Sequence, residues 1–529
     1  MRISDFPASV RPHLVPGTAG RLIYRCLGCD AEHGIDRLLY TCPSCGAVLL
    51  LYDPDFDRLR SLSPGQWQRL FDYRKMLNVA ALKGIYRFHE FIGPVIPLEA
   101  VVYLGEGGTP VVEANERLAR MAGGRFYFKN DGQNPSASFK DRGMASAMSY
   151  IRYLIQSGKV ADVLAVCAST GDTSAAAALY AAYLQPDVKS AVLLPHKKVT
   201  PQQLSQPLGS GAAVFEIPGV FDDCMKVVEA LSEQYNVALL NSKNAWRILG
   251  QESYSYEIAQ DFEYETADKA VLVPVGNAGN ITAVMSGFLK FHEIGIIDGL
   301  PKIVGVQSAH ADPVYRYYRE PDPDRRRYEP VSVRDSVAQA AMIGNPVSMP
   351  RVVRLARQYD AAAAGRRVFF VQVTEQEIMD WELIANRNGH IACTQGGESL
   401  AGLVKARKEG IVDADETAVV DATAHAIKFS GFQEMYFSGR FPEEFEIAPV
   451  PELVNRPALV RPADLQRVPE PGSPLAGDDL DAFVARVTEE IARRLDLKKT
   501  GSSKRSKRVG PDADDRRTPC GRNGGADGR

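Results

Sequence analysis

The sequence contains no long apolar run. Across its 529 residues, no uninterrupted apolar stretch reaches the roughly 18 residues that a membrane-spanning helix needs. Residues 1–20, MRISDFPASVRPHLVPGTAG, also lack the apolar core of a secretory signal. These absences predict a cytoplasmic protein without a membrane partner.

The chain also lacks an excess of charge of one sign. Its 62 Lys and Arg residues nearly balance 65 Asp and Glu residues, which leaves a net charge of −3. A near-neutral chain gives no electrostatic reason to expect nucleic acid as the main partner. With 45% hydrophobic and 24% charged residues, the composition is that of a globular protein of about two to four domains.

Cysteine is sparse, and half of it lies near the N-terminus. Four of the eight cysteines form the pairs CLGC and CPSC, whose spacing suits one structural zinc ion held by four thiolates. A chance pairing or a redox pair is the alternative. We predict a zinc-ribbon-like module over residues 20–50. Its predicted metal ligands are Cys26, Cys29, Cys42 and Cys45. Cys167, Cys224 and Cys393 lie in apolar or mixed stretches and are predicted to be buried thiols.

The pattern of apolar residues predicts the class of the main body. Residues 55–98 are expected to be mostly helical. From about residue 100 to 450, short β-branched runs such as VLAVCAS and AVLVPVG alternate with longer helical patterns. Such alternation is typical of βαβ units with buried, mainly parallel sheets. The fold class expected is therefore α/β.

The alternating region from about residue 100 to 450 is longer than a single sheet domain usually needs. We therefore predict two open α/β domains with a ligand in the cleft between them. The larger domain is expected over residues 99–145 and 240–450, and the smaller over residues 146–239. Residues 461–529 are expected to form a Pro-rich linker, one amphipathic helix and a disordered tail, because the tail cannot bury enough apolar surface to fold.

The stretch NPSASFKDRG places Lys140 at the start of a predicted helix. The helix dipole disfavours a positive charge there. Either Lys140 is an ordinary solvated lysine, or its pKa is lowered so that the neutral amine can form a Schiff base.

Two strand-to-helix junctions are rich in small residues that suit anion binding. In CASTGDTSAA, hydroxyl groups and a glycine at a helix start suit a carboxylate, and a plain N-cap is the alternative. In PVGNAGNI, two glycines allow a nest of backbone N–H groups that suits a phosphate, and a tight turn is the alternative. The first junction contains Ser169, Thr170, Gly171, Asp172, Thr173 and Ser174. The second contains Gly276, Asn277, Ala278, Gly279 and Asn280.

The second junction has neither a Walker motif nor GxGxxG, so a dinucleotide is not indicated. A lysine, a phosphate nest and a carboxylate loop together suit pyridoxal 5'-phosphate, an aldehyde-bearing cofactor that withdraws electrons from an amino-acid Cα.

NPSASFKDRG resembles the lysine motif of fold-type II pyridoxal-phosphate enzymes. In the same order along the chain, LGEGGTP, ASTGDTSAA, PVGNAGNI and DATAHAIKF resemble motifs of the threonine synthases in that family. The resemblance covers roughly residues 20–445 and includes the zinc-ribbon-like segment, which some relatives share.

The resemblance implies a role for each motif. Lys140 binds the cofactor covalently and acts as acid–base catalyst, and the 276–280 turn holds the cofactor phosphate. Asp172 lies at the cofactor, and the 169–174 loop takes the substrate carboxylate. Thr423 offers a hydroxyl to the pyridine nitrogen, with a strand-end cap as the alternative. Candidates for binding the substrate phosphate are Ser138, Lys129, Asn130 and Arg142, and weaker candidates are Asn244, Arg247 and Gln251.

Some of these assignments have structural alternatives. Arg142 could instead form an ion pair with Asp141 or Asp131. Asp172 stands where many fold-type II relatives have asparagine. Residues 389–403 replace a small-residue stretch that shapes the substrate side of the cleft in many relatives. His425 is expected to hold its loop by hydrogen bonds rather than to act as a base.

The implied activity is that of threonine synthase, a lyase that converts O-phosphohomoserine and water to L-threonine and phosphate. Alternatives on the same scaffold are a serine/threonine dehydratase or a cysteate synthase. An alternative of a different class is a zinc-ribbon binding protein with a non-catalytic α/β scaffold. The expected partner is a small phosphorylated amino acid, and a homodimer is compatible with this architecture.

Overall fold

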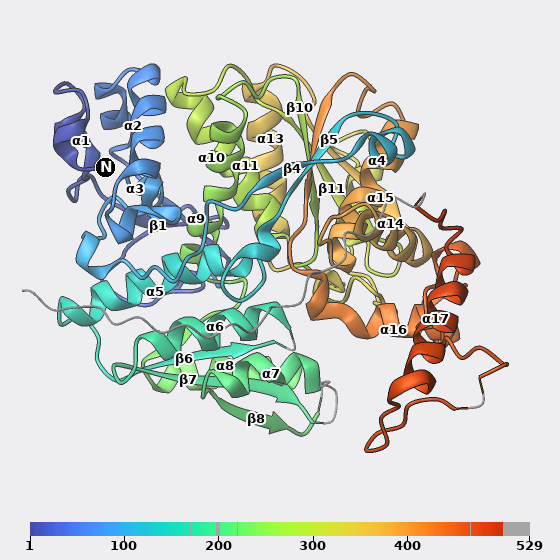
Figure 1. Ribbon diagram of the computed structural model, residues 1–529. Coiled ribbons are helices and arrows are strands. Elements are labelled where there is room, and N and C mark those ends of the chain that lie inside the picture. Colours follow the sequence, from blue (N-terminus) through green and yellow to red (C-terminus); the bar gives the residue numbers. More distant parts are fainter. Residues whose placement is uncertain (170, 197–200, 220, 466, 501–529) are drawn as a thin grey trace, which may run out of the picture. The chain divides into compact units, whose positions relative to one another are not determined.

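The computed structural model describes residues 1–169, 171–196, 201–219, 221–465 and 467–500. The chain divides into one compact unit, Met1–Val454, and a second unit, Asn455–Arg529. The first unit contains two mainly parallel sheets and one small antiparallel sheet (Figure 1). The predicted α/β class is therefore confirmed. The proposed domain boundaries within this unit stay predictions.

The small antiparallel sheet lies in the N-terminal segment that carries the four clustered cysteines. Its strand order is β2-β1-β3, with β1 at Ile23–Cys26, β2 at Glu32–Gly34 and β3 at Leu49–Tyr52. Tyr24 on β1 is buried, and its hydroxyl accepts a 3.0 Å hydrogen bond from Trp246 Nε1. The Tyr24 and Tyr150 hydroxyls are 3.3 Å apart. These contacts attach the small sheet to helices α5 (Lys140–Gln156) and α9 (Ala245–Gln251).

The large sheet has six strands in the order β12-β11-β10-β13-β5-β4. All neighbouring strands are parallel except β4, which is antiparallel to β5. Neither β4 nor β5 was predicted from the sequence. The strands are β4 (Val111–Glu113), β5 (Phe126–Lys129), β10 (Lys269–Pro274), β11 (Lys302–Ser308), β12 (Val368–Val373) and β13 (Thr417–Asp421).

Helices cover both faces of this sheet (Figure 1). Val271 and Val273 of β10 share a core with α11 (Gly279–Ile294) and α13 (Met349–Ala362). Ala270 and Leu272 point to the opposite face and share a core with α14 (Glu375–Arg387) and α15 (Thr394–Lys408). Because successive strand residues alternate between two buried faces, the strand sequence is apolar throughout.

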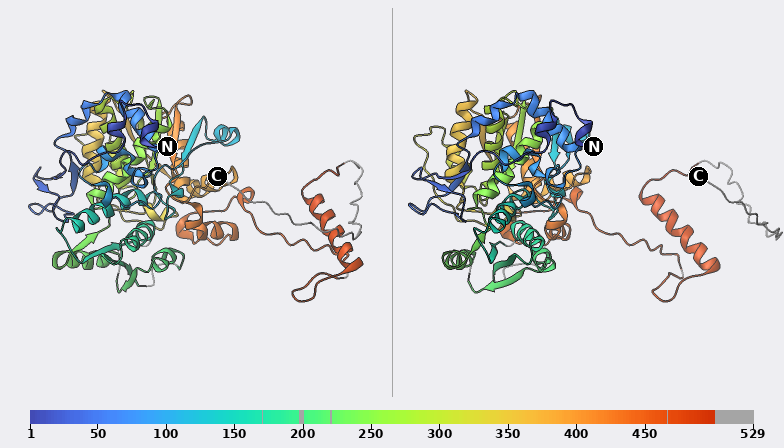
Figure 2. Two further views of the ribbon diagram at one scale, coloured as in Figure 1. Left: turned by 60° about the vertical axis from the view of Figure 1, so that its left-hand side comes forward. Right: turned by 90° about the vertical axis from the view of Figure 1, so that its left-hand side faces the viewer.

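The smaller parallel sheet has the order β8-β7-β6-β9. It lies on the far side of α5 from the large sheet and stays at the lower side of the first unit in both views of Figure 2. Its strands are β6 (Val163–Ala168), β7 (Val188–Pro195), β8 (Ala213–Ile217) and β9 (Val237–Leu239). Its helices are α6 (Asp172–Tyr183), α7 (Pro201–Gly209) and α8 (Phe221–Gln234).

The remaining helices lie around these sheets. The predicted helical segment between residues 55 and 98 contains α2 (Pro64–Met76) and α3 (His89–Ile92). The others are α1 (Arg11–Leu14), α4 (Glu116–Met121), α10 (Ser253–Asp261), α12 (Pro313–Arg319), α16 (Ser430–Ser438) and the 3₁₀ turns η7 (Gln339–Ala341) and η8 (Ala426–Phe429).

In the second unit, the predicted amphipathic helix is confirmed as α17 (Gly477–Arg494). The predicted disordered tail lies, from residue 501 onward, outside the described residues. Among the residues that the structure describes, no helix is long and apolar enough to cross a membrane.

Candidate active site

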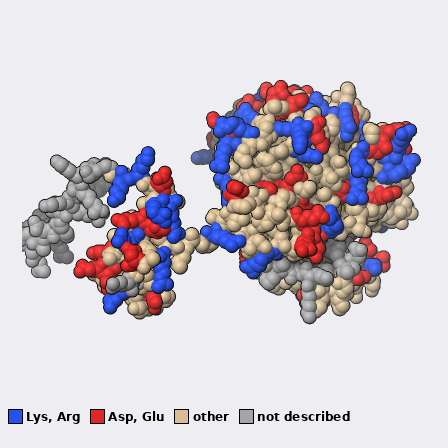
Figure 3. Space-filling model, turned by 90° about the vertical axis from the view of Figure 1, so that its right-hand side faces the viewer, with Lys and Arg blue, Asp and Glu red and all other residues tan. Residues whose placement is uncertain are grey.

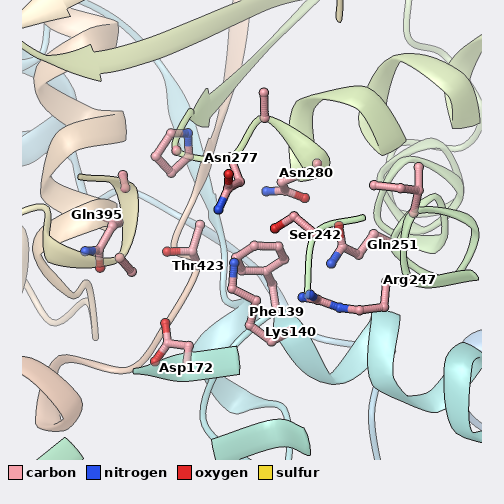
Figure 4. Close-up of a pocket in the computed structure, with 17 residues that line it drawn as sticks. Phe139, Lys140, Asp172, Ser242, Arg247, Gln251, Asn277, Asn280, Gln395 and Thr423 are labelled. Atoms are coloured by element: carbon pink, nitrogen blue, oxygen red, sulfur yellow. The ribbon is translucent and has the colours of Figure 1, made fainter. Parts of the chain in front are cut away.

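Lys140 is the first residue of α5, and its side chain points into a pocket (Figure 4). Burial, together with the positive charge of Arg247, lowers the pKa of its amine to about 8. Asp172 and Asp421 act in the opposite direction. The amine lies 4.1 Å from the centroid of the Phe139 ring. A substantial neutral fraction at physiological pH makes this amine a nucleophile and a base.

The pocket collects residues from distant parts of the chain (Figure 4). Every residue predicted to bind the cofactor lines it: Lys140, Asp172, Gly276, Asn277, Ala278, Gly279, Asn280 and Thr423. Lys140 begins α5, Asp172 follows β6, the 276–280 turn follows β10, and Thr423 follows β13. Their convergence therefore depends on the fold and not on local sequence.

Hydrogen bonds between two backbone segments bring Lys140 close to Thr423. The Phe139 N–H donates to the Thr423 carbonyl at 2.8 Å, and the His425 N–H donates to the Ala137 carbonyl at 3.0 Å. The segment after β13 thus runs beside the segment that enters α5. This pairing fixes the start of α5 at the carboxyl end of the large sheet.

The Gly276–Asn280 turn links β10 to the N-terminus of α11. Ala278, with φ 60°, is the residue in the left-handed region, whereas the sequence suggested that glycine or asparagine would take it. The first N–H groups of α11 have no partner within the helix, and the helix dipole adds positive potential. The turn is therefore suited to an anion. Asn280 Nδ2 donates to Asp421 Oδ2 at 2.8 Å, which attaches the turn to the end of β13.

Position 276 has no room for a side chain, so glycine is required there. A Cβ on Gly276 would lie 2.8 Å from Ala341 Cα and 3.2 Å from the Ala340 carbonyl oxygen. Both alanines belong to η7 and line the pocket. The turn and η7 therefore pack with their backbones in contact at this wall of the pocket.

Asp172 starts α6 and brings the smaller sheet to the pocket. Lys428 Nζ, from η8, lies 3.0 Å from Asp172 Oδ1. The same ammonium donates to the Ser136 carbonyl at 2.8 Å and to Gln206 Oε1 at 2.9 Å. One ion pair and two hydrogen bonds therefore connect Lys428 to three separate segments of the chain.

The other described residues of the predicted carboxylate loop do not line this pocket. Ser169 Oγ accepts from the Gly171 N–H at 3.3 Å, and Ser174 Oγ donates to the Gly171 carbonyl at 2.7 Å. Thr173 is half-buried in the first turn of α6. Thr170, which belongs to the same prediction, lies outside the described residues.

Arg142 and Lys129, predicted as substrate-binding cations, lie in a buried ion-pair network. Arg142 Nη2 is 2.7 Å from Asp131 Oδ1 and 2.8 Å from Glu257 Oε2. Lys129 Nζ is 3.1 Å from Glu257 Oε2 and 2.9 Å from Asp261 Oδ2. Neither lines the pocket. We correct their assignment accordingly: both cations are engaged by carboxylates, and the structural alternative noted for Arg142 holds through Asp131.

Ser138 and Asn130 are buried beside this region but do not line the pocket. Within the described residues, neither Ser138 Oγ nor Asn130 Oδ1 has a hydrogen-bond partner. Both atoms can still form a hydrogen bond to a bound group.

Of the three weaker candidates for binding the substrate phosphate, two line the pocket and one does not. Arg247 and Gln251 of α9 line the pocket, and burial lowers the pKa of Arg247 to about 10. Asn244 instead caps α9, because its Oδ1 accepts from the Trp246 N–H at 2.9 Å. The sequence reasoning missed Phe139, Ser242, Ile248, Pro274, Ala340, Ala341 and Gln395. Among these, Phe139, Pro274 and Gln395 had a signal, because they belong to NPSASFKDRG, PVGNAGNI and the 389–403 stretch.

His425 Nδ1 accepts from the Ile427 N–H at 3.2 Å and so holds its own loop, as predicted. Cys167, Cys224 and Cys393 are buried, also as predicted.

The four N-terminal cysteines form a compact sulfur cluster. All four Sγ atoms, of Cys26, Cys29, Cys42 and Cys45, lie within 4.8 Å of one another. Tetrahedral thiolate coordination at about 2.3 Å from a zinc ion requires separations of this size. The donor set is chemically suited to that metal.

The pocket residues fit pyridoxal phosphate in three respects. The Lys140 amine has a lowered pKa, as imine formation requires. Gly276 lets the turn contact the backbone of η7 at the pocket wall, where a side chain would not fit. The N-terminus of α11 faces the same pocket and can hold a phosphate.

Comparisons with known proteins agree with this chemistry. Residues 102–423 match the family model described as pyridoxal-phosphate dependent enzyme. The threonine synthase of Methanocaldococcus jannaschii is 33% identical over 77% of this chain and 93% of its own length. Chloroplastic threonine synthase 2 of Arabidopsis thaliana is 32% identical over 82% of each chain.

Among solved structures, threonine synthase from Escherichia coli has a similar fold, with a TM-score of 0.59 and 19% identity over 80% of this chain and 94% of that one. The family match spans the lysine, the glycine-asparagine turn and Thr423, and the first two relatives extend it over most of their length. The chain therefore belongs to the pyridoxal-phosphate-dependent enzymes and, within them, to the threonine synthase family.

Proposed function

We propose that the chain converts O-phosphohomoserine and water to L-threonine and phosphate with pyridoxal phosphate as cofactor. The observation that carries this proposal is the shared pocket of Lys140, the Gly276–Asn280 turn and Thr423 in a chain 33% identical to a threonine synthase. When bound, pyridoxal phosphate supplies an electron sink for negative charge at the substrate Cα.

We assign cofactor binding and proton transfer to residues of the chain. The Gly276–Asn280 turn and the α11 N-terminus bind the cofactor phosphate. Lys140 removes and returns the proton at the substrate Cα, for which a pKa of about 8 is suitable. Thr423 is assigned to the pyridine nitrogen, because a neutral hydroxyl leaves that nitrogen without a full positive charge.

Substrate binding requires cationic or polar groups beside the cofactor. Arg247 and Gln251 line the pocket and are the groups that we assign to the substrate, in place of Arg142 and Lys129. In the net reaction the Cγ–O bond to phosphate breaks, Cβ loses a proton and Cγ gains one. Water adds its hydroxyl at Cβ, and its remaining proton leaves with phosphate.

The test is a comparison of substrates on the purified chain loaded with pyridoxal phosphate. O-phosphohomoserine is expected to release phosphate and threonine in equal amounts, and Lys140→Ala is expected to release neither. Phosphate release from phosphoserine alone, or keto-acid release from threonine alone, would overturn the proposal in favour of a cysteate synthase or a dehydratase.

We also propose that the four clustered cysteines bind one structural zinc ion. The sulfur separations and the attachment of β1 to α5 and α9 support this role. A cytoplasmic location and a homodimer stay predictions from the sequence.

A further inference from the structure

Thr423 lies beside a buried thiol that has no part in the reaction as assigned above. Cys393 Sγ is 3.7 Å from Thr423 Oγ1, and the two residues are 0% and 4% exposed. Ala424 and Phe429 pack with Cys393 in a small apolar cluster. Because water is largely excluded, the few polar atoms nearby determine where the thiol and hydroxyl protons point.

Backbone pairing fixes the approach of these two side chains. Ala392 and His425 form an isolated antiparallel bridge, so the segment before α15 runs beside the segment after β13. Cys393 follows Ala392 directly, and Thr423 lies two residues before His425. The short distance between the thiol and the hydroxyl is therefore set by the fold.

The amide of Gln395 determines what the sulfur accepts. Its oxygen accepts from the Ala340 N–H at 3.1 Å and from the Gln339 N–H at 3.2 Å. In the opposite orientation, the amide N–H groups would face these two backbone N–H groups, and none of them would have an acceptor there. The Gln395 nitrogen is therefore the atom directed at Cys393 Sγ, at a separation of 3.3 Å.

The sulfur in turn donates to the hydroxyl. Burial raises the pKa of Cys393 to about 12, so the thiol keeps its proton. Since the Gln395 nitrogen is a donor, Thr423 Oγ1 is the acceptor that the described part of the chain offers to the thiol. Thr423 has one hydroxyl proton, and while its oxygen accepts from the thiol, that proton points away from the sulfur. It is left for a group bound in the pocket.

The arrangement leads from the protein interior to the pocket. Gln395 and Thr423 line the pocket (Figure 4), whereas Cys393 does not. Acidic and basic side chains are mixed over the face of the first unit shown in Figure 3, so that surface adds no strong field of one sign. The near neighbours of Thr423 therefore set the direction of its proton.

We propose that Cys393 is a positioning residue, which accepts a hydrogen bond from Gln395 and donates one to Thr423, so that the Thr423 hydroxyl donates into the pocket. This inference rests on the proposed function, in which the group that accepts from Thr423 is the pyridine nitrogen of the cofactor. A ring nitrogen that accepts from a hydroxyl carries no proton of its own. The thiol thus favours the unprotonated ring without contacting it.

The S–H stretching band of Cys393 tests the direction of the thiol proton on the full chain. The infrared difference between each protein and its Cys393→Ala counterpart isolates this band, which lies at lower wavenumber when the thiol donates. Thr423→Val is expected to raise the wavenumber, because the acceptor is lost. Gln395→Met is the control and is expected to leave the band low, because the hydroxyl is still present.

A band that stays in place in Thr423→Val would overturn the proposal. A rise in Gln395→Met alone would also overturn it, because the thiol would then donate to the Gln395 oxygen. This measurement does not depend on which reaction the protein catalyses.

Pyridoxal phosphate labelled with nitrogen-15 in its ring tests the effect on the bound cofactor. The ring-nitrogen resonance moves downfield when a hydrogen-bond donor is lost and far upfield when the nitrogen is protonated. Cys393→Ala is expected to move it downfield by part of the shift seen in Thr423→Val, because the hydroxyl loses the bond that strengthens its own donation. Cys393→Ser, which keeps a donor, is expected to return it toward the wild-type position. Cys224→Ala, which removes a buried thiol from α8, is expected to leave it unchanged.

The outcomes separate this inference from the proposed function. A wild-type resonance in Cys393→Ala, with a shifted one in Thr423→Val, would overturn the role of Cys393 and leave Thr423 at the ring. An unchanged resonance in Thr423→Val would overturn both assignments. Threonine formation is assayed separately, so a failure of the proposed reaction would leave these shifts as they are.

Discussion

Lys428 Nζ lies 3.0 Å from Asp172 Oδ1, and this ion pair connects the segment after β13 with the first residue of α6. One partner follows the large sheet, and the other begins a helix of the smaller sheet. Their side chains are 12% and 3% exposed, so the pair is nearly removed from water. The wall of the pocket at Asp172 therefore depends on a cation outside the pocket lining.

Replacing Lys428 with methionine is expected to destabilise the protein by about 3–5 kcal/mol, because it leaves a buried carboxylate without its cation. Chemical unfolding measures this change. The double variant Lys428→Met/Asp172→Asn is the control, since a neutral amide needs no counter-charge, and it is expected to recover most of the loss. A double variant as unstable as Lys428→Met would contradict the pairing.

The pKa of Lys140 predicts how cofactor capture depends on pH. The amine must be neutral to attack an aldehyde, and burial lowers its pKa from 10.5 to about 8. The rate at which cofactor-free protein captures pyridoxal phosphate should therefore rise with pH and reach half its maximum near pH 8. Stopped-flow absorbance measures this rate, and borohydride reduction followed by peptide mapping identifies the residue. A midpoint near 10.5 would indicate a solvated lysine.

Gly276→Ala is expected to weaken pyridoxal phosphate binding roughly ten- to hundredfold, because overpacking of this kind costs about 1–3 kcal/mol. The added Cβ would lie 2.8 Å from Ala341 Cα, so η7 would have to move. Gly431→Ala is the control, since a Cβ there meets nothing within 4 Å. Equal cofactor dissociation constants for the two variants, measured by fluorescence titration, would contradict the crowding at Gly276.

Arg142→Met is expected to lower the free energy of unfolding by about 3–5 kcal/mol, because it leaves the buried carboxylates of Asp131 and Glu257 without this cation. The KM for substrate should change little in the protein that remains folded at low temperature. A rise in KM of more than tenfold with an unchanged unfolding midpoint would instead place Arg142 at the substrate.

The purified protein is expected to contain one zinc ion per chain by elemental analysis, and Cys42→Ser is expected to lose it. The melting temperature should fall in the same variant, because β1 would no longer be held in position to bring Tyr24 against Trp246. Cys224→Ala, which removes a buried thiol elsewhere, should keep the metal. Full zinc content in Cys42→Ser would rule out the proposed site.

The sequence was sufficient for the strands that are long and β-branched, because their apolar runs are continuous on both buried faces. β4 and β5 were missed because they are only three and four residues long. The position of β5 depends on pairing with β13, almost 300 residues later, and such a partner leaves no local pattern.

The same limit applies to the pocket. Motifs identified the residues that bind through charge, amide or backbone, such as Lys140 and Asn280. Ala340 and Ala341 have no chemical signature, and only their contact with Gly276 shows their role. The sequence left open whether Arg142 binds substrate or forms an ion pair. One of its two acidic partners, Glu257, is 115 residues away and so leaves no local pattern.

The strand order of the large sheet has a consequence for how the nascent chain matures on the ribosome. β5 leaves the exit tunnel early, yet its parallel neighbour β13 ends only at Asp421. At about 5–20 residues per second, β5 waits roughly 15–60 s for that neighbour. Until then the antiparallel pair of β4 and β5 has an open edge, and a chaperone that shields this edge would favour correct completion of the sheet.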